Sequence, residues 1–373
     1  MAAGFGVRYV LSRQVARPQD QESALVDWEQ ARQLALRVSR WEQAPIDDRA
    51  LRHAQYARMV AQSEPLIAAY MGVELPAPVE RLFVVDRRDW LLVNFVSFQH
   101  LLQPIEELYG KIASSNAATT VMGTVNRKLL GGQMGLLLGY LAQRVLGQYD
   151  LSLLSPDPEL RGALYFVEPN IKRVQSQLGL SDEDFRLWIA LHETTHVFQF
   201  EAFPWVRPYF NELLSSFLGE VTDQFNGAGM SFSQIANRLM GGKANGGEHW
   251  MQAVLSPQQR QVFDRMQALM SVVEGYSNHV MNEIGEQLLP SFREIERRIA
   301  QRKGSRTLIE ELFNRVTGMD LKLAQYQQGE AFINAVVAQR GIAFANQVWS
   351  GPEYLPTMDE IKNPERWIAR VGA

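Results

Sequence analysis

The sequence contains no cysteine. This absence excludes disulfide bonds, thiolate ligands for a metal ion and a cysteine nucleophile, and it fits a reducing compartment. Any metal ion must therefore be held by His, Asp or Glu side chains.

The sequence also has little excess charge of either sign. It carries 37 Lys and Arg residues against 41 Asp and Glu residues, which gives a net charge of −4. A balance of this kind provides no broad basic field for phosphate backbones. We therefore expect no nucleic-acid partner.

Long apolar runs are missing as well. The most apolar window, residues 129–142, is shorter than the roughly 20 residues that span a bilayer, so we expect a buried helix and no membrane association. Gly131, Gly135 and Gly139 recur every four residues in this window, which predicts a face that a neighbouring backbone approaches closely; a membrane dimer face is the alternative. The first 20 residues lack the features of a secretory signal, so we expect a cytoplasmic protein.

What the sequence does contain is helical periodicity over most of its 373 residues, with 46% hydrophobic residues to build a large core. Residues 162–167 (GALYFV) are the clearest strand candidate. The pattern predicts a mainly α fold with a short β element. Glycines spread through residues 225–250 are typical of a loop or lid beside a cleft.

The motif HETTH at 192–196 is the strongest chemical signal in the chain. Ser181 and the acidic residues after it predict the start of a helix, on which His192 and His196 project from one side about one turn apart. Two imidazoles spaced in this way are typical of a zinc site, and Glu193 between them is placed to take a proton from a bound water. The alternative is a pair of core histidines satisfied by hydrogen bonds.

A third ligand must come from elsewhere, and Glu274 is the best candidate. It lies against the apolar side of a predicted helix, where a bare carboxylate would cost several kcal/mol unless a cation or hydrogen bonds met it. Asn278, four residues later on the same face, is positioned to bond the outer nitrogen of a ligand imidazole. His279 points about 140° away from Glu274, so we prefer Glu274 as the ligand. An ion pair of Glu274 with Arg207 is the alternative.

A donor for the developing oxyanion is harder to choose. The candidates are Tyr276, His279, Tyr209 and Tyr326. Most tyrosines of a helical protein pack with their hydroxyl group at the surface, so none of the four is favoured over the others.

Several motifs together resemble a family of bacterial zincin-like hydrolases, some of whose members are linked to coenzyme F420 biosynthesis. The motifs are LHETTHVFQFEAFPWVRPYF at 191–210, EGYSN at 274–278, YQQGEAF at 326–332 and LPTMDEI at 355–361. The resemblance implies a mainly helical zincin-like fold. We expect its core at residues 151–373, preceded by an N-terminal helical region at residues 1–150, or both in one packed body. It also implies a gluzincin-type site with two His and one Glu ligand. Gluzincins commonly have Asp where this chain has Asn278, which predicts weaker support for a ligand imidazole.

We therefore expect a zinc-dependent hydrolase, and a peptidase first, with Glu193 as general base. Residues 162–167 are the expected strand for pairing with an extended peptide. Two alternatives stay open. One is a non-catalytic helical protein with a structural or binding metal site, and the other is an amidohydrolase that acts on a small metabolite or other small amide.

Overall fold

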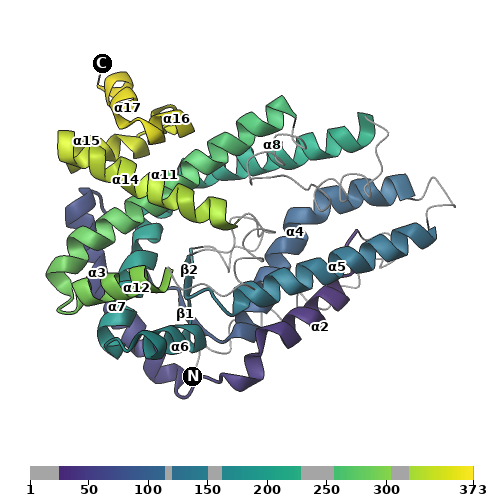
Figure 1. Ribbon diagram of the computed structural model, residues 1–373, viewed down its shortest axis with the longest axis horizontal. Coiled ribbons are helices and arrows are strands. Elements are labelled where there is room, and N and C mark those ends of the chain that lie inside the picture. Colours follow the sequence, from purple (N-terminus) through teal and green to yellow (C-terminus); the bar gives the residue numbers. More distant parts are fainter. Residues whose placement is uncertain (1–24, 114–119, 150–161, 228–255, 304–318, 373) are drawn as a thin grey trace. The chain divides into compact units, whose positions relative to one another are not determined.

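The structure is a computed structural model and describes residues 25–113, 120–149, 162–227, 256–303 and 319–372 (Figure 1). The described chain is mainly helical, as predicted. Its elements are α2 (Trp28–Ser39), η1 (Trp41–Gln43), α3 (Arg49–Met71), β1 (Leu82–Val85), α4 (Arg87–Ala113), α5 (Thr120–Ala142), β2 (Gly147–Tyr149), β3 (Leu164–Val167), α6 (Glu168–Leu178), α7 (Asp182–Val197), η5 (Phe198–Ala202), α8 (Val206–Gly227), α11 (Pro257–Leu288), α12 (Phe292–Lys303), α14 (Met319–Arg340), α15 (Ile342–Ala345), η6 (Asn346–Trp349), η7 (Pro352–Tyr354), α16 (Met358–Lys362) and α17 (Pro364–Val371).

Internal packing divides the chain into two compact units. The first comprises residues 1–61 and 79–193, and the second comprises residues 62–78 and 194–373. This division is based on packing alone. The expected boundary between an N-terminal helical region and a zincin-like region, near residue 150, stays a prediction.

A three-stranded sheet in the order β1-β3-β2 lies in the first unit. The predicted strand is confirmed as β3, and all four of its residues are buried, as a continuous apolar run predicts for a central strand. β3 runs parallel to β1 and antiparallel to β2, with Phe166 opposite Gly147. The expectation that a peptide pairs with this strand is wrong, because β1 and β2 already occupy both of its edges.

The glycine face of α5 packs against α2 in the same unit. A Cβ atom added at Gly131 or Gly135 would lie 2.6 Å from the carbonyl oxygen of Asp27 or Ala31, respectively. The predicted close approach of a neighbouring backbone is therefore confirmed. The helix is less buried than predicted on another face, where Leu129 and Leu136 are 48% and 50% exposed.

A buried polar cluster joins the ends of several helices in this unit. The guanidinium of Arg87, at the start of α4, donates to Asn170 Oδ1 (2.8 Å) and to the carbonyl oxygen of Ser39 (3.0 Å). Asn170 in turn donates to the carbonyl oxygens of Ala142 and Val145, both at 2.8 Å. These bonds satisfy backbone groups at the ends of α2 and α5 that would otherwise be buried without partners.

A buried ion pair fixes α7 beside the sheet. Arg186 Nη2 of α7 lies 2.5 Å from Glu168 Oε1 at the start of α6, and the two side chains are 1% and 4% exposed. The hydroxyl of Tyr56 donates to the other oxygen of Glu168 at 2.8 Å, and its ring stacks on Phe166 of β3. Hydrogen bonds of this kind are needed before a buried charge pair is tolerated.

The second unit is built around α11, which packs against α8 and α14. The backbones of α11 and α14 approach most closely at two glycines: a Cβ atom on Gly275 would lie 2.2 Å from the carbonyl carbon of Gly329. Trp367 of α17 is fully buried and makes edge contacts with Phe332 and Phe344. The C-terminal helices therefore belong to the core of this unit.

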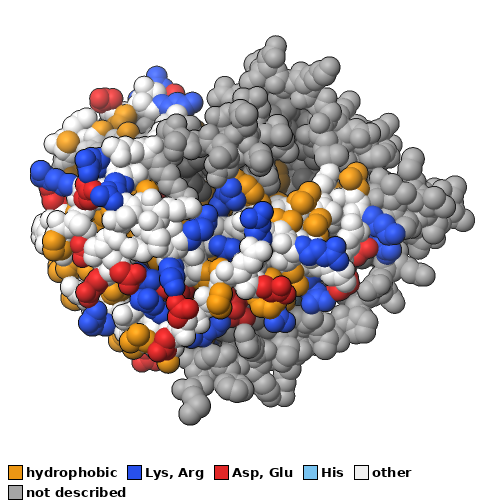
Figure 2. All heavy atoms as spheres, turned by 60° about the horizontal axis from the view of Figure 1, so that its bottom comes forward, with side chains coloured by type: hydrophobic (Ala, Val, Ile, Leu, Met, Phe, Trp, Pro, Cys, Tyr) orange, Lys and Arg blue, Asp and Glu red, His pale blue; other side chains and the backbone are white. Residues whose placement is uncertain are grey.

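The surface shown in Figure 2 carries basic and acidic side chains of the described residues interspersed with one another. Exposed ion pairs such as Arg58–Glu183 (2.7 Å) are part of this pattern. Among the described residues, no helix combines the length and the apolar composition that crossing a membrane requires. Within the predicted loop or lid, residues 228–250 lie outside the described part of the chain, and α8 extends up to Gly227.

Candidate metal centre

Helix α7 carries the HETTH motif. The hydroxyl of Ser181 accepts a hydrogen bond from the amide of Asp184 (3.4 Å), so the predicted helix start is confirmed. The acidic first turn is favourable at the positive end of the helix dipole. The segment is buried on several sides: Leu191, Thr194 and Thr195 are fully buried, and Glu193 and His196 are nearly so.

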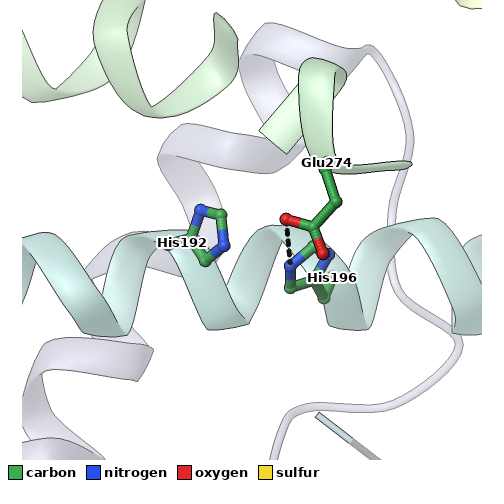
Figure 3. Close-up of side chains that lie close together, drawn as sticks. All are labelled: His192, His196 and Glu274. Carbon is green, nitrogen blue, oxygen red and sulfur yellow. Dashed lines mark ion pairs between the residues drawn. The ribbon is translucent and has the colours of Figure 1, made fainter. Parts of the chain in front are cut away.

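The side chains of His192, His196 and Glu274 lie together (Figure 3). Each offers a ligand atom, and these atoms all lie within 4.8 Å of one another. The distance from His196 Nε2 to Glu274 Oε2 is 4.0 Å. Helices α7 and α11 thus bring together the three residues that the sequence predicts as ligands.

This donor set fits a zinc ion. Two imidazole nitrogens and a carboxylate oxygen are a common catalytic set, which leaves a position open for water or substrate. Ligand atoms of a tetrahedral zinc ion lie about 3.4 Å apart, given bonds of about 2.1 Å, so the three side chains need to close by about 1 Å. The side chains of His196 and Glu274 are 11% and 23% exposed, which leaves them space to adjust.

Glu193 lies outside the cluster of ligands. Its side chain is buried against β2 in the first unit, where a Cβ atom added at Gly147 would lie only 2.5 Å from Glu193 Oε1. A larger residue at 147 would displace the carboxylate. The absence of a side chain at Gly147 of β2 therefore provides the space in which the Glu193 carboxylate lies.

The outer nitrogen of His196 is held by groups that the sequence analysis did not select. His196 Nδ1 lies 2.8 Å from Gln199 Oε1 and 3.2 Å from Ser277 Oγ. The expectation that Asn278 bonds a ligand imidazole is wrong in this structure, because its amide donates to Glu330 Oε2 (3.2 Å) on α14. A Gln three residues after the second histidine lies on the same helix face, which is the signal that would have pointed to Gln199.

The candidates for oxyanion stabilisation have other partners. The hydroxyl of Tyr276 donates to Asn346 Oδ1 (2.6 Å), and burial raises its pKa above the ordinary value, so it stays protonated. His279 is buried, with Nε2 2.7 Å from the hydroxyl of Tyr70 and Nδ1 2.6 Å from Asn334 Oδ1. Both of its ring nitrogens are therefore engaged away from the ligand cluster.

The other residues weighed at this site have contacts of their own. Arg207, the alternative partner of Glu274, donates to Glu201 Oε1 at 2.8 Å. Tyr209 packs against the ring of Trp205, with the centroids 5.9 Å apart. The side chain of Tyr326 lies outside the described part of the chain.

A family model described as zincin-like metallopeptidase matches residues 26–368. Among solved structures, the chain is similar to one from Chloroflexus aurantiacus described as "a putative hydrolase with a novel fold", at 59% sequence identity and a TM-score of 0.70. That similarity covers 93% of this chain and 99% of the other. No curated protein matches the chain.

Proposed function

The chain belongs to the zincin-like metallopeptidase family, and from this we propose that it is a zinc-dependent peptidase in which Glu193 is the general base. The observation that carries the proposal is the convergence of His192, His196 and Glu274 within 4.8 Å. The Chloroflexus aurantiacus protein, which is described as "a putative hydrolase", supports the broader class of reaction.

In this proposal three residues bind the metal ion and a fourth transfers the proton. His192, His196 and Glu274 would hold the zinc ion, which when bound polarises a scissile carbonyl group and lowers the pKa of water. Glu193 accepts the proton of the attacking water and passes it to the leaving amine. Its exclusion from the ligand set supports this role, because a carboxylate that binds the metal is less available as a base.

We place the peptide beside β2 rather than β3. β2 lies at an edge of the described sheet, and its Gly147 lies against the carboxylate of Glu193. An extended peptide that adds to this edge as a further strand would have its backbone close to the general base. The burial of β3 between β1 and β2 supports this choice over the strand expected from the sequence.

The first experiment compares Glu193→Gln with Glu183→Gln, using a peptide library and a measurement of bound zinc. Glu183 lies on the same helix with its side chain 67% exposed, so its replacement is a matched control. Removing a general base costs about 10²–10⁴-fold in rate. We expect such a loss for Glu193→Gln at unchanged zinc content, and wild-type activity for Glu183→Gln.

Other outcomes distinguish the alternatives. Retained activity in Glu193→Gln would remove this residue from the mechanism. One zinc ion per chain without hydrolysis of any substrate would favour a non-catalytic metal site, and hydrolysis of small amides without peptides would favour a metabolite amidohydrolase.

The second experiment tests the position of the carboxylate through Gly147→Ala. The added methyl group meets Glu193 Oε1 at 2.5 Å, so the carboxylate must move by about 1 Å, a displacement that costs up to about 10²-fold in rate. We expect kcat/KM to fall while bound zinc is unchanged. Unchanged kinetics would contradict the placement of Glu193 against β2 as a catalytic requirement.

A further inference from the structure

Gln199 is a buried polar residue that no role in the proposed reaction yet uses. It lies in η5, a π-helical turn that directly follows α7, and its side chain is fully buried. Single π-helical turns are uncommon and occur frequently at functional sites. A buried amide requires hydrogen-bond partners, and here these partners define its orientation.

The backbone of α11 fixes which end of the Gln199 amide faces His196. The amide nitrogen Nε2 donates to the carbonyl oxygen of Val273 at 2.8 Å. A carbonyl oxygen only accepts, so the nitrogen must lie on that side and Oε1 on the other. Oε1 therefore faces His196 Nδ1, at 2.8 Å.

This orientation decides where the proton of the His196 ring resides. Oε1 is an acceptor, so Nδ1 must carry a hydrogen; a bare Nδ1 at 2.8 Å would set two lone pairs against each other. The hydroxyl of Ser277 lies 3.2 Å from Nδ1 and donates its hydrogen to the same Oε1 at 3.2 Å, so it too offers Nδ1 only an acceptor. In neutral imidazole, a proton on Nδ1 leaves the lone pair on Nε2.

The other ring nitrogen, Nε2, is the one that faces the ligand cluster. Nε2 lies 4.0 Å from Glu274 Oε2, which is too long for a hydrogen bond. We infer that Gln199 is a positioning residue, which holds His196 as the Nδ1–H tautomer and so directs the Nε2 lone pair to the metal site before any metal arrives. The inference deepens the proposed function and rests on it for the use of that lone pair.

Long-range ¹H–¹⁵N NMR of the metal-free chain, labelled at histidine, tests the inference directly. His196 is assigned by the signal missing from His196→Gln. We expect the Nδ1–H tautomer in the wild type and its loss in Gln199→Met, which keeps the length of the side chain but offers no acceptor oxygen. Ser277→Ala removes the other polar group near Nδ1 but keeps Gln199 and its bond to Val273, so it is expected to retain the tautomer. The tautomer of the wild type decides the inference even if the Met variant does not fold.

Zinc affinity, measured by competition with a chelator, is the second readout. Loss of a group that orients a ligand imidazole weakens metal binding about 10–100-fold, which we expect for Gln199→Met. Thr357→Ala, which removes the capping box of α16, controls for a general loss of stability and is expected to bind zinc like the wild type.

The inference is overturned if His196 is the Nε2–H tautomer in the wild type. It is also overturned if Gln199→Met keeps both the wild-type tautomer and the wild-type zinc affinity. A wild-type chain that binds no zinc would refute the proposed function instead, and the tautomer of His196 in the metal-free chain would still decide the inference.

Discussion

Replacing Gly275 with alanine tests the close packing that positions α11. Gly275 directly follows Glu274 on this helix and faces Gly329 of α14. The added Cβ atom would lie 2.2 Å from the carbonyl carbon of Gly329 and 2.4 Å from the backbone nitrogen of Glu330, whereas ordinary contacts begin at 3.4 Å. Backbone atoms cannot rotate away, so the helices must separate by about 1 Å.

The expected cost follows from two opposing effects. Overpacking of a well-packed core costs about 1–3 kcal/mol, and the upper end applies here because the clash is with backbone. Alanine recovers about 1 kcal/mol through its higher helix propensity. The net loss is about 2 kcal/mol, which for a unit of this size lowers Tm by about 4–8 °C.

Thermal unfolding followed by tryptophan fluorescence measures this loss, and Gly219→Ala is the matched control. Gly219 lies within α8, and a Cβ atom there would meet nothing within 4 Å. The same substitution is therefore expected to raise Tm, through about 0.5–1 kcal/mol of helix propensity. An equal rise in Tm for Gly275→Ala would refute the packing of α11 on α14 described above.

The remaining predictions concern buried charges in the first unit. Burial raises the pKa of Glu106 above its ordinary value of 4.5 and outweighs the hydrogen bonds from Trp28 and Val26. The folded chain therefore binds the proton of the Glu106 carboxyl more tightly than the unfolded chain does. The stability that this protonation contributes is complete below pH 4.5 and is lost as the pH rises through the folded-state pKa. Glu106→Gln is therefore expected to lessen the fall in Tm above pH 4.5, and an unchanged profile would contradict this. Arg186→Met is expected to lower the free energy of unfolding by about 3 kcal/mol in urea, since it leaves Glu168 buried without its main partner; a loss under about 1 kcal/mol would contradict it.

Local sequence patterns predicted the parts of the fold that depend on local physics. Ser181 and the acids after it predicted the start of α7, and the run at 162–167 predicted a strand. The spacing of Gly131, Gly135 and Gly139 predicted a close helix contact. Each of these features depends on residues that are close together in the sequence, so it can be predicted from the local pattern alone.

Features that depend on distant partners were not predicted. The edges of β3 are covered partly by β2, a strand of only three residues with no alternating pattern. Asn278 bonds Glu330 rather than an imidazole, because α14 packs on that face of α11. Ser277 is not part of any sequence motif that predicts a contact, and only the approach of η5 to α11 brings its hydroxyl to Gln199.

For Glu274, the sequence pattern predicted the surroundings of the side chain but not its position relative to the histidines. Its place on the apolar side of a predicted helix pointed to a buried carboxylate in need of a cation. The pattern did not give the distance to the histidines, which depends on how α11 packs in the second unit.

The zinc affinity of Glu274→Gln, measured by competition with a chelator, tests whether this carboxylate and the two imidazoles bind one zinc ion. The substitution keeps the shape of the side chain and removes its charge, and Glu283→Gln on the same helix is the control. We expect one zinc ion per wild-type chain and per Glu283→Gln chain, and binding at least about 10²-fold weaker in Glu274→Gln, since a ligand contributes at least as much as the groups that orient it. Wild-type affinity in Glu274→Gln would contradict the claim that this carboxylate and the two imidazoles bind one ion.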